Sequence, residues 1–250
     1  MVEETQKTVT LSRTLGTFEV IFLGVGALLG GGIFTLLGHV AGLSGGGLLL
    51  SMIIGAGISF FNLNSYVALA TTFPEAGGGY IWVRDGLGDI NGFLSGWLSW
   101  MASSVACSLY SVSFGIFAVE LFFTILKIPN FGISNTVWRL IFTISVIFLF
   151  GFVNYRGASF FGKIGGRISM FVLAILGLYI IFGFKKIIIA PELLIKNLTP
   201  FLPFGLLGVA QAAGLFYIAF EGTEIQAQTG EEVKDPARTL KIGLFGSWGI

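Results

Sequence analysis

The chain has 250 residues, of which 54% are hydrophobic and only 11% charged, and its mean hydropathy is +0.89. A soluble domain carries about 25% charged residues, so we expect this chain to be surrounded by a bilayer rather than by water. Its single cysteine, Cys107, excludes an internal disulfide, and a net charge of +1 without a basic cluster argues against nucleic-acid binding.

Stretches without charge predict the membrane spans, because a span needs about 20 consecutive apolar residues. No Asp, Glu, Lys or Arg occurs from Val20 to Pro74, which leaves room for two spans. We therefore predict an all-α integral membrane protein with about six or seven transmembrane helices. The predicted spans cover residues 18–37, 47–71, 93–124, 137–154, 166–184 and 204–229, and a truncated seventh begins near Leu240.

The segments between the spans predict the orientation. Residues 1–17 are polar and form an N-terminal tail. If this tail is cytoplasmic, the inner segments hold more Lys and Arg than the outer ones, as the positive-inside rule requires. Residues 185–203 then form an extracellular connection, and residues 230–239 form a cytoplasmic loop. The sequence thus predicts a multi-pass protein of the cell membrane with a cytoplasmic N-terminus.

Glycines interrupt the first predicted span, in the segment GVGALLGGGIF from Gly24 to Phe34. Each glycine inside a helix costs about 1 kcal/mol relative to alanine, and two interpretations stay open. Gly26 and Gly30 form a GxxxG pair that suits close helix packing. Alternatively, the helix is unwound at 30–32, and the half-helix that begins at Ile33 directs free N–H groups at an anion such as a carboxylate.

Two carboxylates interrupt the sixth span, where Glu221 and Glu224 flank Gly222. A carboxylate inside the membrane costs about 2.5–3.5 kcal/mol and points to a functional site. The alternative is that the span ends at Phe220 and both glutamates are interfacial. A second break at this place is the pattern expected of two five-helix inverted repeats. Residues 18–184 would be the first repeat, and residues 204–250 the start of the second.

Several segments resemble the amino acid/polyamine/organocation (APC) transporter superfamily. They are GVGALLGGGIFTLLG in the first span, FPEAGGGY after the second, and FEGTE followed by GEEVKDPART in and after the sixth. The resemblance implies a LeuT-like inverted-repeat transporter fold, truncated here, with discontinuous helices 1 and 6. It also implies a secondary active transporter of amino acids that works by alternating access, and not an enzyme, with no catalytic residue, cofactor or metal.

The resemblance also implies a substrate site at the midplane, between the unwound parts of helices 1 and 6. The substrate carboxylate would meet backbone N–H groups of the glycine run, and the amino group would meet carbonyls of both breaks. Carried over by motif, the expected substrate-binding residues are Leu28, Gly30, Gly31, Gly32, Ile33, Ala219, Phe220, Glu221, Gly222 and Glu224. Thr223 stands where the family often has a bulky aromatic gate, so occlusion would come from elsewhere. Glu224 and Thr223 are the candidates for coupling or gating.

The two glutamates leave the substrate and the driving force open. An ionised Glu221 would favour a polyamine, another organic amine or a cationic amino acid. Glu224 would be either a proton carrier or a structural hydrogen-bond acceptor, and the coupling partner would be a proton, sodium or a counter-substrate. Besides its small-molecule substrate, the protein would contact membrane lipids. An alternative from another class is a non-transporting membrane module that binds or senses a ligand.

Overall fold

The computed structural model describes residues 12–30, 32–156 and 158–250. In this part of the chain every element is a helix or a helical turn, apart from one isolated parallel bridge between Leu15 and Val233. The helices are α1 (Thr17–Leu28), α2 (Leu37–Ser44), α3 (Leu48–Thr72), α4 (Gly79–Leu87), α5 (Asp89–Val119), α6 (Asn135–Tyr155), α7 (Ala158–Ile189), α8 (Pro191–Leu198), α9 (Gly205–Tyr217), α10 (Thr223–Ala227) and α11 (Pro236–Gly249). The turns between them are the π-helical η1 (Gly32–Leu36) and η3 (Glu120–Ile125), and the 3₁₀-helical η2 (Gly45–Gly47), η4 (Ile218–Phe220) and η5 (Gly230–Glu232).

Long apolar helices confirm that the protein is built for a membrane. Five stretches have the length and composition needed to cross one, namely Thr17–Thr72, Asp89–Ile125, Asn135–Tyr155, Ile164–Ile189 and Gly205–Ala227. The first stretch has 56 residues and contains both the interrupted first helix and α3, so it accommodates two of the predicted spans. The predicted seventh span corresponds to α11, which has 14 residues.

The first helix is interrupted where the glycine run begins. Helix α1 ends at Leu28, the π-helical turn η1 starts at Gly32, and α2 continues as far as Ser44. The helical segment is therefore longer than the predicted 18–37, because an apolar sequence without charges does not show where its helix stops. The turn comes at Gly45, whose φ of +57° is a left-handed conformation that favours glycine.

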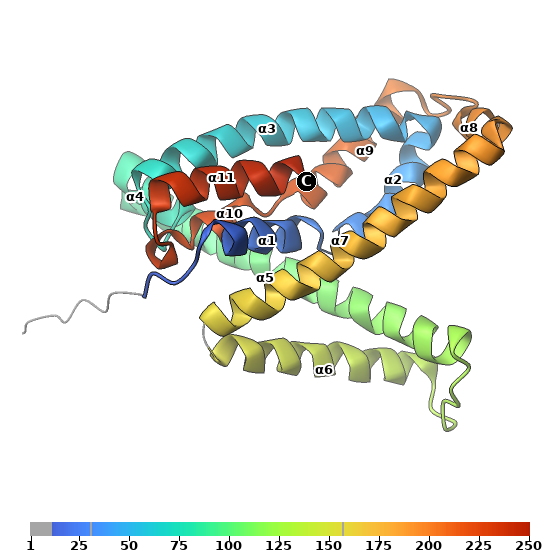
Figure 1. Ribbon diagram of the computed structural model, residues 1–250, viewed down its shortest axis with the longest axis horizontal. Helices are drawn as coiled ribbons and strands as arrows, with labels where there is room; N and C mark the ends of the chain where they lie inside the picture. Colours follow the sequence, from blue (N-terminus) through green and yellow to red (C-terminus); the bar gives the residue numbers. More distant parts are fainter. Residues whose placement is uncertain (1–11, 31, 157) are drawn as a thin grey trace, which may run out of the picture.

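Helices α1, α2, α3, α9, α10 and α11 form one packed cluster. In it α11 lies between α1 and α3 (Figure 1). Val20 of α1, Leu63 of α3 and Leu244 of α11 are all fully buried and form its centre. Helix α9 packs against α2 and α3 around Val40 and Phe216. Both interrupted helices thus belong to the same packed unit.

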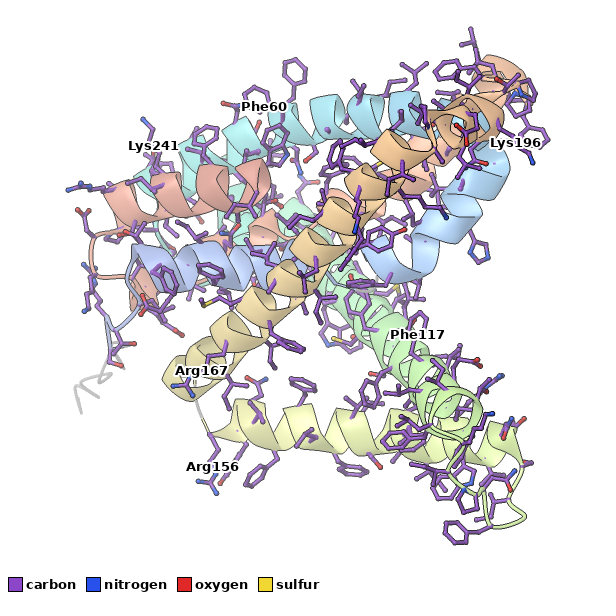
Figure 2. The ribbon with its side chains drawn as sticks, turned by 45° about the vertical axis from the view of Figure 1, so that its right-hand side comes forward. Phe60, Phe117, Arg156, Arg167, Lys196 and Lys241 are labelled. Carbon is purple, nitrogen blue, oxygen red and sulfur yellow. The ribbon has the colours of Figure 1, made fainter. Side chains whose placement is uncertain are left out.

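Helices α5, α6 and α7 form what we call the arm, which lies beside the packed cluster and contacts it where α7 packs against α1. Figure 1 shows α5 and α6 leading away from it in a V and α7 crossing diagonally back to α8. None of the residues of α6, all of which the structure describes, is buried. Figure 2 labels the basic side chains Arg156, Lys196 and Lys241, which lie outside the five membrane-crossing stretches, and Arg167, which lies near the start of one, whereas Phe60 lies midway along α3. This distribution suits helices whose middle parts face an apolar medium.

Candidate functional site

The two helix breaks are in direct contact through Gly222. A Cβ atom at this glycine would lie 3.0 Å from the Cβ of Ala27 and 3.2 Å from the backbone nitrogen of Leu28. The φ of Gly222 is −177°, an extended value that any residue adopts, so close approach is what requires glycine here. The structure thus brings together Leu28 and Gly222, which the sequence predicted for one site from positions almost 200 residues apart.

Both breaks interrupt the helical hydrogen-bond pattern. The N–H of Leu29 still donates to the carbonyl of Val25 at 2.8 Å, at the end of α1. In the second break, the N–H of Glu221 donates to the carbonyl of Ile218 at 3.2 Å, and Glu221 itself is extended (φ −83°, ψ 116°). Such interruptions present backbone N–H and C=O groups that a ligand can use.

The first break also faces the arm. A Cβ atom at Gly30 would lie 3.2 Å from Cζ and 3.3 Å from the hydroxyl oxygen of Tyr110, a residue of α5. Gly32 begins η1. Gly31, which the sequence predicted for the same site, lies outside the described residues. The tyrosine hydroxyl is therefore a polar group of the arm that lies close to the glycine run.

A cavity of about 220 Å³ touches both breaks. The first break contributes Leu28, Leu29 and Ile33 to its wall, and the second contributes Ala219 and Phe220. The remaining described lining residues are Val25, Met52, Phe216, Ser247, Trp248 and Ile250. Four of the predicted site residues thus line one cavity, and its wall is almost entirely apolar.

Polar side chains gather beside the second break and form what we call the polar cluster, namely Asn62, Tyr66, Ser99, Tyr217, Glu221 and Glu224. The Tyr217 side chain lies close enough to Glu221 and Asn62 for both to interact with its hydroxyl group. Ser99 of α5 donates its hydroxyl proton to Oε1 of Glu224 at 2.9 Å. Tyr66 lies close enough to both glutamates for their charges to act on its hydroxyl group. Neither glutamate is among the described residues that line the apolar cavity.

Asn62, Ser99 and both tyrosines of the polar cluster were not predicted from the sequence. Asn62 and Tyr66 are four residues apart on α3, so they share one helix face. The run of polar side chains in the segment NLNSY, 62–66, within a mostly apolar span is a signal that could have found them. Ser99 lies in the third span, whose serines are numerous, and only the tertiary structure singles it out.

Thr223 does not resemble an aromatic gate. Its side chain is only 3% exposed, and its hydroxyl has no hydrogen-bond partner among the described residues. It is the first residue of α10 and directly follows Gly222. A buried hydroxyl without a partner is costly, so it is a candidate to bind a polar group of a ligand.

The loops that follow α3 and α10 pack against each other. A Cβ atom at Gly230 would lie 2.6 Å from the carbonyl carbon of Pro74, and the N–H of Ala76 donates to Oε1 of Glu231 at 3.1 Å. Burial, and secondly the charge of Glu231, raise the pKa of Glu232 above its ordinary value of 4.5. The FPEAGGGY and GEEVKDPART segments therefore form one contact region.

Known proteins match nearly the whole chain. A family model described as amino acid permease matches residues 15–250. The branched-chain amino acid permease BcaP of Bacillus subtilis is 30% identical over 259 residues, which cover 95% of this chain and 52% of the relative. The methylthioribose transporter of Bacillus subtilis is 27% identical over 252 residues, with 98% and 53% covered. Cationic amino acid transporter 5 of Arabidopsis thaliana is 30% identical over 251 residues, with 96% and 42% covered. The chain spans about half the length of the curated relatives it matches.

Proposed function

We propose, because the chain belongs to the amino acid permease family, that it forms part of a secondary active transporter that moves amino acids by alternating access. In this proposal residues 18–184 are the first five-helix repeat and residues 204–250 begin the second. The observation that carries it is the contact of the two helix breaks, where Gly222 lies against Ala27 and Leu28. Interrupted helices that meet inside the membrane are typical of substrate sites in transporters.

The substrate's backbone groups would bind at these breaks. Its carboxylate would accept hydrogen bonds from N–H groups at Gly30 and Gly32, where the partial positive charge of a helix start favours an anion. Its amino group would donate to carbonyls near Leu28 and in 219–221. The buried hydroxyl of Thr223 supports this placement, because a bound substrate would give it a partner.

Uptake of radiolabelled amino acids into proteoliposomes tests this site. We expect Gly222→Val to abolish uptake, since its side chain would separate the two breaks. Gly214→Val on α9 is the matched control, because a Cβ atom there meets nothing within 4 Å. Size-exclusion chromatography establishes that both variants fold. Wild-type uptake rates in folded Gly222→Val would refute the proposed site.

The substrate side chain is a separate question, and two observations favour different answers. The apolar cavity beside Leu28 and Phe220 favours a neutral amino acid. The polar cluster, with Glu221 and Glu224, favours a cationic amino acid or a polyamine. Leucine and arginine or polyamine uptake in Glu221→Gln distinguishes them. A selective loss of the cation supports the second answer, and unchanged selectivity supports the first.

Glu224 is proposed as the gating residue, because it joins the second break to the arm through Ser99. If Glu224 also carries the coupling proton, Glu224→Gln will transport with a flattened pH dependence. If it acts only as a hydrogen-bond acceptor, uptake will fall while the shape of its pH dependence stays that of the wild type.

The proposed orientation places the N-terminus in the cytoplasm. Because Cys107 is the only cysteine, Cys107→Ser gives a cysteine-free background for labelling. In that background, Lys196→Cys on α8 should react with a membrane-impermeant maleimide added outside cells, whereas Lys241→Cys on α11 should not. The reverse labelling pattern would invert the proposed topology.

A further inference from the structure

Gln226 is a fully buried polar side chain in the short helix α10, between the second break and the loop that follows it. Its amide nitrogen donates to the carbonyl of Val20 in α1 at 3.0 Å and to the carbonyl of Gly243 in α11 at 3.1 Å. Its amide oxygen accepts a hydrogen bond from the hydroxyl of Ser247 in α11 at 3.0 Å. One side-chain amide thereby connects three helices.

The surrounding residues leave space for this amide and little else. A Cβ atom at Gly24 would collide with the Gln226 amide group, and one at Gly243 would collide with the side chain of Val20. Both of its amide protons and its oxygen are used, as a buried amide requires. The two glycines of α1 and α11 therefore explain how these helices approach closely enough for one side chain to bond both.

Helix α10 has a second and different attachment two residues earlier. Glu224 is only partly buried and bonds Ser99 of the arm. A partly exposed hydrogen bond can exchange for one to water, whereas breaking the bonds of Gln226 would leave buried polar groups without partners. The contact to α1 and α11 is thus the more costly one to break, and the contact to α5 is the less costly one.

From this geometry we propose that Gln226 is a positioning residue that fixes the second break relative to the first, so that both keep one arrangement while the contact to the arm opens and closes. This inference rests on the proposed transport function and deepens it. Gln226 does not touch the apolar cavity. It acts through the backbone of Val20, eight residues before Leu28 at the first break, and of Gly243, 21 residues after Gly222 at the second.

The test replaces the amide by a carboxyl group of the same shape. In Gln226→Glu the carboxylate still accepts from Ser247, but its other oxygen faces two carbonyls and repels them. The protonated carboxyl donates one hydrogen bond instead. The described contacts of this side chain are two backbone carbonyls and a hydroxyl, none of which titrates. Burial disfavours the ionised form of a carboxyl group, so protonation should begin well above the ordinary value for Glu of about 4.3. Uptake relative to wild type should therefore fall about 10-fold near pH 8 and recover near pH 5.

Two further variants complete the experiment. Gln226→Leu removes all three bonds and should lower uptake about 10-fold at both pH values. Gln211→Glu on α9 is the matched control, because it places a carboxyl group in the same membrane-crossing stretch at an exposed site that bonds neither α1 nor α11. Any effect of the carboxyl group alone should therefore appear in this variant as well. Hydrogen exchange of the α10 amides, compared with wild type at the same pH, reports whether Gln226 holds α10 against α1 and α11, without any need for transport.

The outcomes separate this inference from the proposed function. Faster exchange in Gln226→Glu at high pH, together with pH-dependent uptake, supports the positioning role. Altered exchange with unaltered uptake reduces Gln226 to a purely structural residue and overturns the proposal, as does behaviour like that of Gln211→Glu in both measurements. If the wild-type protein transports no amino acid, the proposed function fails. In that case, exchange that is equal in Gln226→Glu and Gln211→Glu also overturns the positioning role of Gln226.

Discussion

The packed cluster and the arm each contain strongly apolar stretches and yet are packed very differently. The mean hydropathy reaches 2.3 in Thr17–Thr72 of the cluster and 2.2 in Ile164–Ile189 of the arm. Leu240 of α11 is fully buried, whereas Tyr179 of α7 is 74% exposed. In a bilayer the hydrophobic effect does little to bring helices together, so small residues and polar contacts decide which helices pack.

Several glycines of the packed cluster lie closer to neighbouring helices than those of α7 do. In the packed cluster, Cβ atoms at Gly24, Gly208 and Gly243 would collide with a neighbouring helix. On α7 of the arm, Cβ atoms at Gly177 and Gly183 would meet nothing within 4 Å. Close glycine contacts mark individual helix pairs, because a Cβ atom at Gly115 of α5 would also lie 2.6 Å from the carbonyl oxygen of Arg139 in α6. The comparison therefore teaches that glycine contacts show which helix pairs approach closely where hydropathy does not.

Truncating one leucine in each region is the strongest test of this comparison. Leu244→Ala in α11 should lower the free energy of unfolding by about 2–5 kcal/mol, because it leaves a cavity in the centre of the packed cluster. Leu178→Ala in α7 is the control and should cost less than about 1 kcal/mol, since this side chain is 55% exposed. Denaturant unfolding in detergent measures both. Equal costs would show that α7 is covered as tightly as α11.

A pair of glycines on one helix sharpens the comparison further. A Cβ atom at Gly208 of α9 would lie 2.5 Å from the carbonyl oxygen of Leu43, so Gly208→Ala should destabilise the protein by about 1–3 kcal/mol. Gly214→Ala, on the same helix with nothing within 4 Å, should be neutral or stabilise by up to about 1 kcal/mol. Thermal unfolding of both variants gives the difference, and a neutral Gly208→Ala would contradict close packing of α2 on α9.

The positions of the two breaks could be predicted from the sequence, because a glycine run and intramembrane carboxylates are local signals. The residues that join the breaks could not. Gln226 bonds backbone carbonyls of α1 and α11, and any residue supplies a carbonyl, so no side-chain pattern announces the partners. Helices α4 and α8 were not predicted either, since each is short and lies where the charge pattern indicated only a connection.

The hydrogen bond between Ser99 and Glu224 joins the packed cluster to the arm, and its strength can be isolated. A double-mutant cycle of Ser99→Ala and Glu224→Gln should give a coupling energy of about 1 kcal/mol in unfolding experiments. Ser104→Ala is the control, because its hydroxyl bonds the carbonyl of Trp100 within α5, and its coupling to Glu224→Gln should be near zero. A vanishing coupling for Ser99 would mean that this bond does not hold the two regions together.

The smallest expected effect concerns Glu232, in the loop that ties the segment before α1 to the packed cluster. The carbonyl of Glu232 accepts from the N–H of Leu15 at 2.9 Å, and the side chain's pKa is raised by burial and by the charge of Glu231. A raised pKa means that ionisation costs more in the folded protein than in the unfolded chain. This cost is absent well below pH 4.5, the ordinary value, and is complete once the pH exceeds the raised value.

Glu232→Gln should therefore stabilise the protein slightly at neutral pH and not at acidic pH. Melting temperatures of the variant and the wild type at the two pH values measure the difference. Glu192→Gln on α8, at the end of the arm, is the exposed control and should shift neither value. A stabilisation by Glu232→Gln that is the same at both pH values would show that ionisation is not its cause. It would mean that ionising Glu232 costs no more in the folded protein than in the unfolded chain.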